Sequence, residues 1–218
     1  MQNRLTGKGA EKKEYCALYL YNETAKKTVI TPEHRQQIRK VCGICSPDIV
    51  IIGTPGEYEA AKLVSEKKDE LKRSLPLWML EKLEAVTRED YEEGFVFPGY
   101  KEAAISSELP AMVFPVGKKG LFAALWDMGE ALFCGIDADL LDIPMSQIVI
   151  EVCECLSLDP YKLASFGTYI MVCRNGKTAE RLLAEQGIRA SCIGNITDGA
   201  DRILRNGENI RYLVPAKQ

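Results

Sequence analysis

The chain has 218 residues, of which 46% are hydrophobic, and this size and composition suit one or two domains with a substantial core. Its formal net charge of -3 gives no general attraction to nucleic acid or to anionic membranes. No apolar run approaches the length that spans a bilayer, and the first residues lack the apolar core of a signal peptide. The sequence therefore predicts a cytoplasmic protein without nucleic-acid or membrane partners.

The first half of the chain predicts alternating strands and helices. Thr31 and Pro32 are favourable residues at a helix start, as N-cap and first helical position. Thr54-Pro55-Gly56 predicts a turn after a buried strand. The elements expected in this half are strands at 15–21, 28–30 and 48–53, helices at 31–42, 57–72, 76–86 and 101–109, and a short helix with a loop at 89–99.

The second half has a clearer pattern. Gly187 is placed to end a helix, and Asn206-Gly207 is a strong signal for a hairpin that closes the chain. The expected elements are strands at 111–114, 135–139, 168–173 and 190–197 and helices from 121, at 146–156 and at 177–186. Because strands and helices are interleaved, the fold class is α/β or α+β.

Eight cysteines and one histidine restrict the metal and redox chemistry open to the chain. Cysteines with apolar neighbours in a cytoplasmic protein are expected to be reduced and buried. Cys42 and Cys45 form a CxxC motif, which suits a redox site or one half of a metal site. No second CxxC follows, so a buried cysteine pair is favoured. A single histidine, His34, excludes a multi-histidine metal site, and no metal ligands are predicted.

A glycine loop, Gly117-Lys118-Lys119-Gly120, leads into an amphipathic helix. Such a loop before a helix presents backbone N–H groups to an anion, and its two lysines add attraction for negative charge. The alternative is a plain turn before a packed helix. Gly53 and Gly56 follow a buried strand and are candidates for the same cleft, although a tight turn is favoured there.

Asp137, Asp139 and Asp142 form an acidic cluster late in the chain. Alternate residues of a strand share one face, so the first two carboxylates are expected side by side. A solvated strand edge is favoured over a metal site, because no further ligand supports the latter.

Three ordered segments together resemble the C-terminal domain of the aminoimidazole ribonucleotide (AIR) synthase-related superfamily. They are 48–56 with the loop 117–121, Leu158-Asp-Pro-Tyr-Lys-Leu-Ala-Ser-Phe-Gly167 with the strand after it, and 187–199. The hydrogenase maturation factor (carbamoyl dehydratase) branch is nearest. The resemblance implies an α/β fold, layered as α/β/α around a mixed sheet, over 48–218. Residues 1–47 are then expected to be a truncated strand–turn–strand–helix remnant of an N-terminal domain.

The resemblance also implies a function. Members use ATP, and aspartates of a first domain carry the metal–ATP site, whereas residues 1–46 of this chain contain no Asp. Their loop pattern Asp-x-Thr-x-Gly-Gly-Leu is altered here, with Pro115 at the Asp position and Gly117 at the Thr position. The dehydratase branch ends in a reactive cysteine, whereas the last cysteine here is Cys192. We therefore expect a protein that binds ATP, another nucleotide or a phosphorylated metabolite and lacks the full ATP-binding domain.

No catalytic residue is assigned, and whether the chain is an enzyme stays open. The ligand-binding candidates are Gly53, Gly56, Gly117, Lys118, Lys119, Gly120 and Gly167. The expected partner is a second copy in a homodimer, to which strand 15–21 would contribute, or a separately encoded ATP-binding domain. The alternatives are an ATP-dependent hydrogenase-maturation-like enzyme and a non-catalytic assembly or structural subunit.

Overall fold

A computed structural model of the chain describes residues 46–85 and 111–215. Several sequence predictions lie outside these residues: the strands at 15–21 and 28–30, the helices at 31–42, 89–99 and 101–109, His34 and the pair Cys42 and Cys45. The expected remnant domain at 1–47 is therefore outside the described structure, apart from its last two residues.

The described residues form a seven-stranded mixed sheet, in the order β2-β4-β1-β5-β3-β6-β7. Neighbouring strands are antiparallel, except that β3 and β6 are parallel. The strands are β1 (Asp48–Ile52), β2 (Ala111–Gly117), β3 (Gly135–Asp139), β4 (Ser165–Cys173), β5 (Ala190–Thr197), β6 (Arg202–Asn206) and β7 (Asn209–Tyr212). The mixed sheet and the α/β class agree with the sequence prediction.

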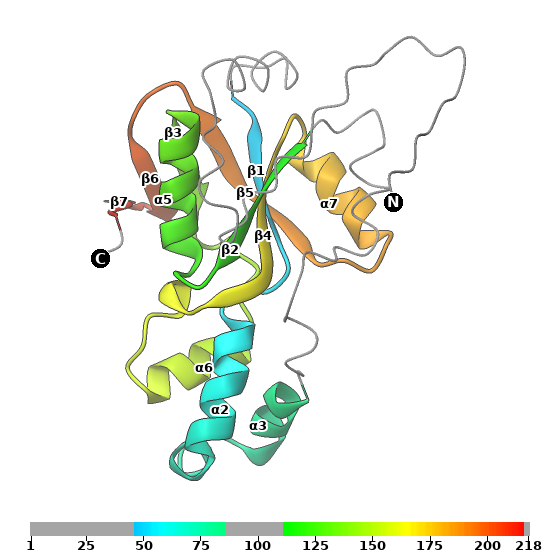
Figure 1. Cartoon of the computed structure of the whole chain (residues 1–218), viewed down its shortest axis with the longest axis vertical. Helices are drawn as coiled ribbons and strands as arrows, with labels where there is room; N and C mark the ends of the chain where they lie inside the picture. Colours follow the sequence, from blue (N-terminus) through cyan, green and yellow to red (C-terminus); the bar gives the residue numbers. More distant parts are fainter. Residues whose placement is uncertain (1–45, 86–110, 216–218) are drawn as a thin grey trace, which may run out of the picture.

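Helices cover the two faces of the sheet and one end of it. Figure 1 shows α5 on one face and α7 on the other, with α2, α3 and α6 grouped below the sheet. The helices are α2 (Glu57–Leu71), α3 (Leu77–Glu84), α5 (Leu121–Leu132), α6 (Gln147–Cys155) and α7 (Gly176–Ala184), with a short 3-10 helix, η2 (Pro160–Lys162). The layered α/β/α arrangement is thus confirmed, and the lower helical group is an addition to it.

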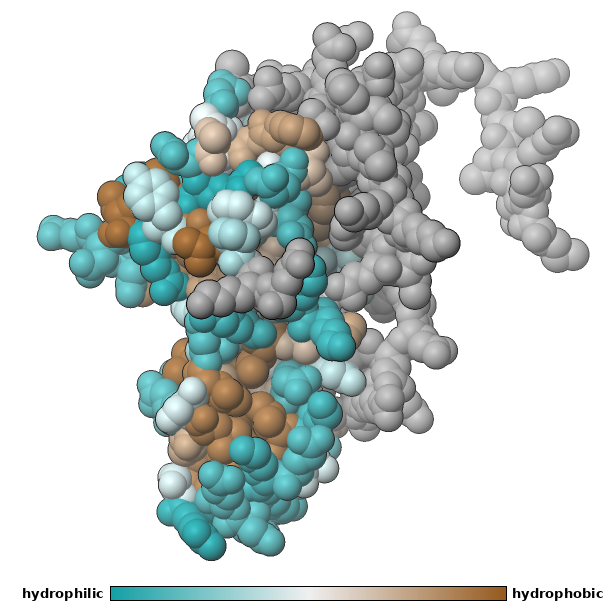
Figure 2. All heavy atoms as spheres, turned by 60° about the vertical axis from the view of Figure 1, so that its left-hand side comes forward, coloured by the Kyte–Doolittle hydropathy of each residue, from teal (hydrophilic) through white to brown (hydrophobic). Residues whose placement is uncertain are grey.

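The alternation of side chains along the strands divides the core. On β1, Ile49 and Ile51 pack towards α5, whereas Val50 and Ile52 pack towards α7. A strand that is buried on both faces reads as a continuous apolar run, which is why 49–52 has no polar residue. A third cluster fills the helical group, and Figure 2 shows hydrophobic surface on the visible face of that group.

Two strands, β2 and β4, are longer than the ranges 111–114 and 168–173 that the sequence predicts. The longer β2 shortens the glycine loop. β2 continues through Pro115 to Gly117, and Gly117 pairs with Ser165 of β4 after a register shift. β2 is the edge strand of the sheet, where a proline without an N–H is tolerated. The connection to α5 is therefore only Lys118-Lys119-Gly120, shorter than the four-residue loop expected.

The hairpin at the end of the chain is confirmed. Asn206 pairs with Asn209, and Gly207 in the turn between them has φ 59°. No helix within residues 46–85 and 111–215 is long and apolar enough to cross a membrane.

Candidate functional site

Three of the predicted glycines, Gly53, Gly56 and Gly120, approach one segment, 160–167, which runs from η2 into the start of β4. Gly120 has φ 81°, and a Cβ added to it would lie 2.6 Å from the carbonyl carbon of Lys162. Gly53 has φ 90°, and its added Cβ would lie 2.8 Å from the carbonyl oxygen of Gly167. Both positions combine a left-handed backbone with a close approach of another backbone, so both need glycine.

Gly56 and Gly117 meet at Ser165, a buried residue at the start of β4, and Gly167 lies two residues further along that strand. The N–H of Gly56 donates to Ser165 Oγ at 2.8 Å, and this hydroxyl donates in turn to the carbonyl of Leu163 at 2.8 Å. Gly117 is the ladder partner of Ser165. The structure thus brings the Gly53–Gly56 turn and the loop before α5 to the same segment, with the Gly56 N–H already used in a protein hydrogen bond.

A cavity of about 860 Å³ lies at the start of α5, between η2 and the end of the chain. Its volume is in the range of small-molecule sites. Three of its lining side chains are cationic. The lining residues are Lys119, Phe122, Ala123, Asp159, Lys162, Leu204, Arg211, Tyr212, Leu213, Val214 and Pro215. Of the two candidate lysines, Lys119 lines this cavity, and Lys118 is exposed and is not among its lining residues.

The cations of this cavity differ in their ion pairs. Lys162 Nζ lies 3.1 Å from Asp159 Oδ2, and the other oxygen of Asp159 accepts the N–H of Tyr161 at 3.1 Å. Lys119 Nζ lies 3.9 Å from Asp127 Oδ2, a loose contact between two exposed side chains. Exposed pairs of this kind contribute little to stability, so the lysine head groups remain available to a ligand.

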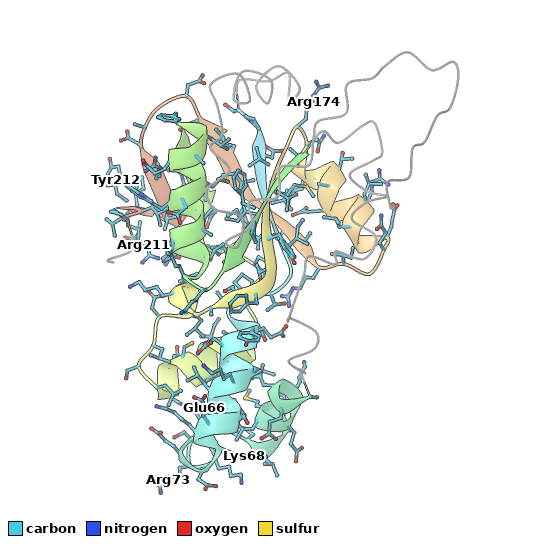
Figure 3. All side chains as sticks on the ribbon, in the orientation of Figure 1. Glu66, Lys68, Arg73, Arg174, Arg211 and Tyr212 are labelled. Atoms are coloured by element: carbon cyan, nitrogen blue, oxygen red, sulfur yellow. The ribbon has the colours of Figure 1, made fainter. Side chains whose placement is uncertain are left out.

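Phe122 and Arg211 line the cavity next to α5, and the ring of Tyr161 packs behind Phe122. The rings of Phe122 and Tyr161 are stacked, with centroids 4.6 Å apart and planes 13° from parallel. The guanidinium carbon of Arg211 lies 4.8 Å from the centroid of the Phe122 ring. Burial raises the pKa of Tyr161, so this phenol is neutral near pH 7. Figure 3 labels Arg211 and Tyr212 on the side of the molecule where β7 lies near α5.

The helix end strengthens the positive field of the cavity. α5 begins after Gly120, and no side chain caps it. The first N–H groups of a helix have no partner within the helix, and they carry the positive end of its dipole. Phe122 and Ala123, in the first turn, line the cavity. The arrangement can therefore hold a phosphate or carboxylate group.

The acidic cluster lies in a different place, on the sheet. Asp137 accepts from Nε and Nη2 of Arg205 at 2.6 Å each, and the hydrogen bond to Arg205 lowers the pKa of Asp137. Asp139 accepts the N–H of Leu141 at 2.9 Å. Asp137 and Asp139 lie on one face of β3, as predicted, but protein donors engage both oxygens of Asp137 and Oδ1 of Asp139. Within the described residues, no group of three or more His, Cys, Asp or Glu is arranged to hold a metal ion.

Two cysteines of the described residues, Cys153 and Cys192, are not activated as nucleophiles. Burial raises the pKa of Cys153 to about 11, so its thiol stays protonated at neutral pH. Burial also raises the pKa of Cys192, which lies on β5 as the sequence predicts.

Comparisons with known proteins show which solved structures have a similar fold. No known family pattern matches the sequence, and no curated protein sequence matches it. Among solved structures, E. coli HypE, a hydrogenase maturation protein, is similar over 80% of this chain and 52% of its own, with 20% identity and a TM-score of 0.60. HypE in complex with ATP matches 79% of this chain and 51% of its own, with 17% identity and a TM-score of 0.54.

A third solved structure extends the likeness beyond HypE. Thiamine-monophosphate kinase from Stenotrophomonas maltophilia K279a matches 74% of this chain and 50% of its own, with 16% identity and a TM-score of 0.50. At these identities the likeness concerns the fold alone, and it agrees with the α/β fold that the resemblance of the ordered segments implies. The chain spans about half the length of the solved proteins that it matches.

Sequence reasoning found part of the cavity and missed the rest. The sequence pointed to Lys119 because this lysine lies in the glycine loop before a helix. Lys162 lies in the quoted segment 158–167 but carried no signal of its own. Arg211 and Tyr212 lie on the short last strand, 79 and 80 residues after the end of α5 at Leu132, and only the sheet order brings them to the cavity.

Proposed function

We propose that this chain binds a nucleotide or a phosphorylated metabolite in the cavity at the start of α5. The observation that carries the proposal is that Lys119, Lys162 and Arg211, from three separate segments, line one cavity beside the uncapped end of a helix. Cationic side chains and helix N–H groups are the usual ligands of phosphate oxygens. The likeness of fold to HypE, one structure of which contains ATP, is consistent with this ligand class.

The seven residues selected from the sequence have unequal parts in this proposal. Lys119 contributes a positive charge to the ligand. Gly53, Gly56 and Gly120 act indirectly, since their backbones let segment 160–167 pack closely and so place Lys162, and Gly117 and Gly167 lie on the paired strands β2 and β4. Lys118 lies next to Lys119 in sequence but outside the cavity lining, which makes it the matched control.

The test is a calorimetric titration of the purified chain with ATP, once with Mg²⁺ and once with EDTA. Lys119→Ala is expected to weaken binding roughly tenfold, or about 1.4 kcal/mol, because a charge-assisted contact to phosphate is lost. Lys118→Ala is expected to leave the dissociation constant within about twofold. Equal effects of the two variants, or no binding of ATP at all, would contradict the proposal.

An ATP-dependent enzyme related to HypE is the second candidate, favoured by the likeness of fold. Its activity would require the half of the solved proteins that this chain does not span. Under this alternative, phosphate release from ATP should appear only when a separately encoded ATP-binding domain is added. The cytoplasmic location stays a prediction.

The partner is proposed to be a second copy of the chain or such a separate domain. Leu77 and Trp78, in the first turn of α3, are 51% and 58% exposed, and large exposed apolar side chains close together are typical of interaction surfaces. Light scattering after size exclusion should give about twice the 24.3 kDa of one chain if the homodimer forms. A strict monomer would leave the separate domain as the partner.

A further inference from the structure

We propose that the free edge of β7 pairs with β7 of a second copy of the chain, so that two seven-stranded sheets join into one across a twofold axis. This inference rests on the second copy proposed above as a partner. It names the surface that this copy uses, the edge of the sheet rather than the exposed side chains of α3, and it does not depend on the ligand of the cavity.

β7 is the last strand of the described sheet, and Figure 1 shows it at the outer margin of the molecule. The strand at the opposite edge, β2, contains Pro115, and a proline at an edge hinders pairing with a further strand. β7 consists of Asn209–Tyr212 and has no proline. Of the two edges of this sheet, β7 is therefore the better suited to accept another strand.

The hydrogen bonds between β6 and β7 determine which backbone groups point outward. The N–H of Leu213 donates to the carbonyl of Arg202 at 2.8 Å, so these two residues form a hydrogen-bonded pair. In an antiparallel ladder such pairs alternate with pairs that share no hydrogen bond, and Ile210 and Tyr212 belong to pairs of the second kind. Their N–H and C=O groups therefore point away from β6. Among the described residues, no backbone hydrogen bond to another element uses these groups.

The same edge carries exposed apolar side chains. Ile210, Tyr212 and Val214, at alternate positions of the chain, are 55%, 64% and 69% exposed. Ile210 and Tyr212 lie on the face of the sheet opposite α5, since Arg211 between them reaches Phe122 of α5. Exposed apolar residues along a free strand edge are typical of a surface that pairs with another chain.

A twofold axis at Tyr212 makes this edge complementary to itself. The two copies of β7 then run antiparallel, with Tyr212 opposite Tyr212 and Ile210 opposite Val214 of the second copy. Aromatic and β-branched side chains thus meet across the axis, and the outward backbone groups form the hydrogen-bonded pairs. Arg211 is opposite Leu213 of the second copy, whereas an axis at Arg211 would place two arginines opposite each other. A twofold dimer requires one patch that fits itself in this way.

The first experiment is light scattering of the full chain at protein concentrations up to about 100 µM, because an interface of one short strand is small and dissociates in dilute solution. The mass should approach twice the 24.3 kDa of one chain. Ile210→Lys places a charge on the edge and should raise the dissociation constant of the dimer about tenfold or more. Leu141→Lys, at an apolar position that is 71% exposed and lies outside β7, is the control and should leave it unchanged. Circular dichroism shows whether each variant is folded.

A disulfide tests the register. Tyr212→Cys places two cysteines opposite each other at the axis, where the Cα atoms of a hydrogen-bonded pair are about 5.5 Å apart and within reach of a disulfide. Mild oxidation should therefore link two copies through position 212. Ile210→Cys would lie about 14 Å from its counterpart and should not exceed the background that the native cysteines give in the unmodified protein. Mass spectrometry of peptides identifies the linked positions.

The outcomes separate this inference from the broader proposals. A dimer that Trp78→Lys dissociates and Ile210→Lys does not would overturn the inference and leave the second copy as the partner. A strict monomer would overturn both. A link from position 212 to Cys16 of the same chain in Tyr212→Cys would show that the strand predicted at 15–21 occupies the edge, which also overturns the inference. Calorimetric titration with ATP decides the function of the cavity independently of all three results.

Discussion

At the scale of single residues, glycines decide how closely the connecting segments approach one another. Gly120→Ala is expected to destabilise the fold by roughly 2–4 kcal/mol, because it adds a clash with the Lys162 backbone to the strain of a conformation (φ 81°, ψ 173°) that is almost confined to glycine. Gly187→Ala is the control for packing: its φ of 73° is also positive, but nothing lies within 4 Å of the added Cβ. Strain alone should cost it about 1 kcal/mol. Urea unfolding measures both, and equal losses would contradict the packing argument.

The ion pair of Asp137 and Arg205 makes a residue-scale prediction about pH. Since the pKa of Asp137 is lowered in the folded state, its contribution to stability is present above the ordinary carboxyl pKa and is lost as the pH falls through the lowered value. Asp137→Asn should therefore destabilise the protein at pH 7 and cost less at pH 3. Asp69→Asn, at an exposed position on α2, is the control. The idea fails if the loss caused by Asp137→Asn is the same at both pH values.

At the scale of elements, one buried arginine joins α5 to the far part of the sheet. Arg202 of β6 pairs with Glu130 at 2.6 Å, and its guanidinium carbon lies 4.1 Å from the centroid of the Trp126 ring. It passes over Gly129, where an added Cβ would meet its side chain. This contact ties the two elements together and so helps to place α5 relative to β6 and β7.

Gly129→Ala tests this junction. In an open helix, alanine in place of glycine would gain about 1 kcal/mol, but here we expect a net loss of about 1–2 kcal/mol because Arg202 must move. In an Arg202→Met background the loss should shrink, since an unbranched, flexible side chain can shift away. Unfolding measurements on the four proteins of this cycle give the coupling energy, and a value near zero would show that the junction does not constrain α5.

At the scale of the whole molecule, the elements were predictable and their assembly was less so. The apolar run 49–52, the helix after Gly120 and the hairpin at Gly207 each have a local cause, and each formed where the sequence placed it. The extension of β2 through Pro115 was missed because it depends on pairing with β4, a long-range contact. The layered fold itself came from the order of three segments that resemble a known family.

The candidate site shows the same division between local and long-range causes. Lys119 was predictable because the loop before a helix is a local pattern. Arg211 was not, since its place beside Phe122 depends on the order of β3, β6 and β7 in the sheet. The candidate glycines stay a prediction as ligand-binding residues, and close packing of the chain on itself accounts for the backbones of Gly53, Gly56 and Gly120.

The most direct test of the central claim is the mapping of amide chemical shifts of the ¹⁵N-labelled chain during a titration with AMP. The account predicts that the largest changes fall on the lining of the cavity: Lys119, Phe122, Ala123, Lys162 and the strand residues Arg211 and Tyr212. Changes centred instead on the acidic face around Asp137 and Asp139, or no saturable changes at all, would contradict it.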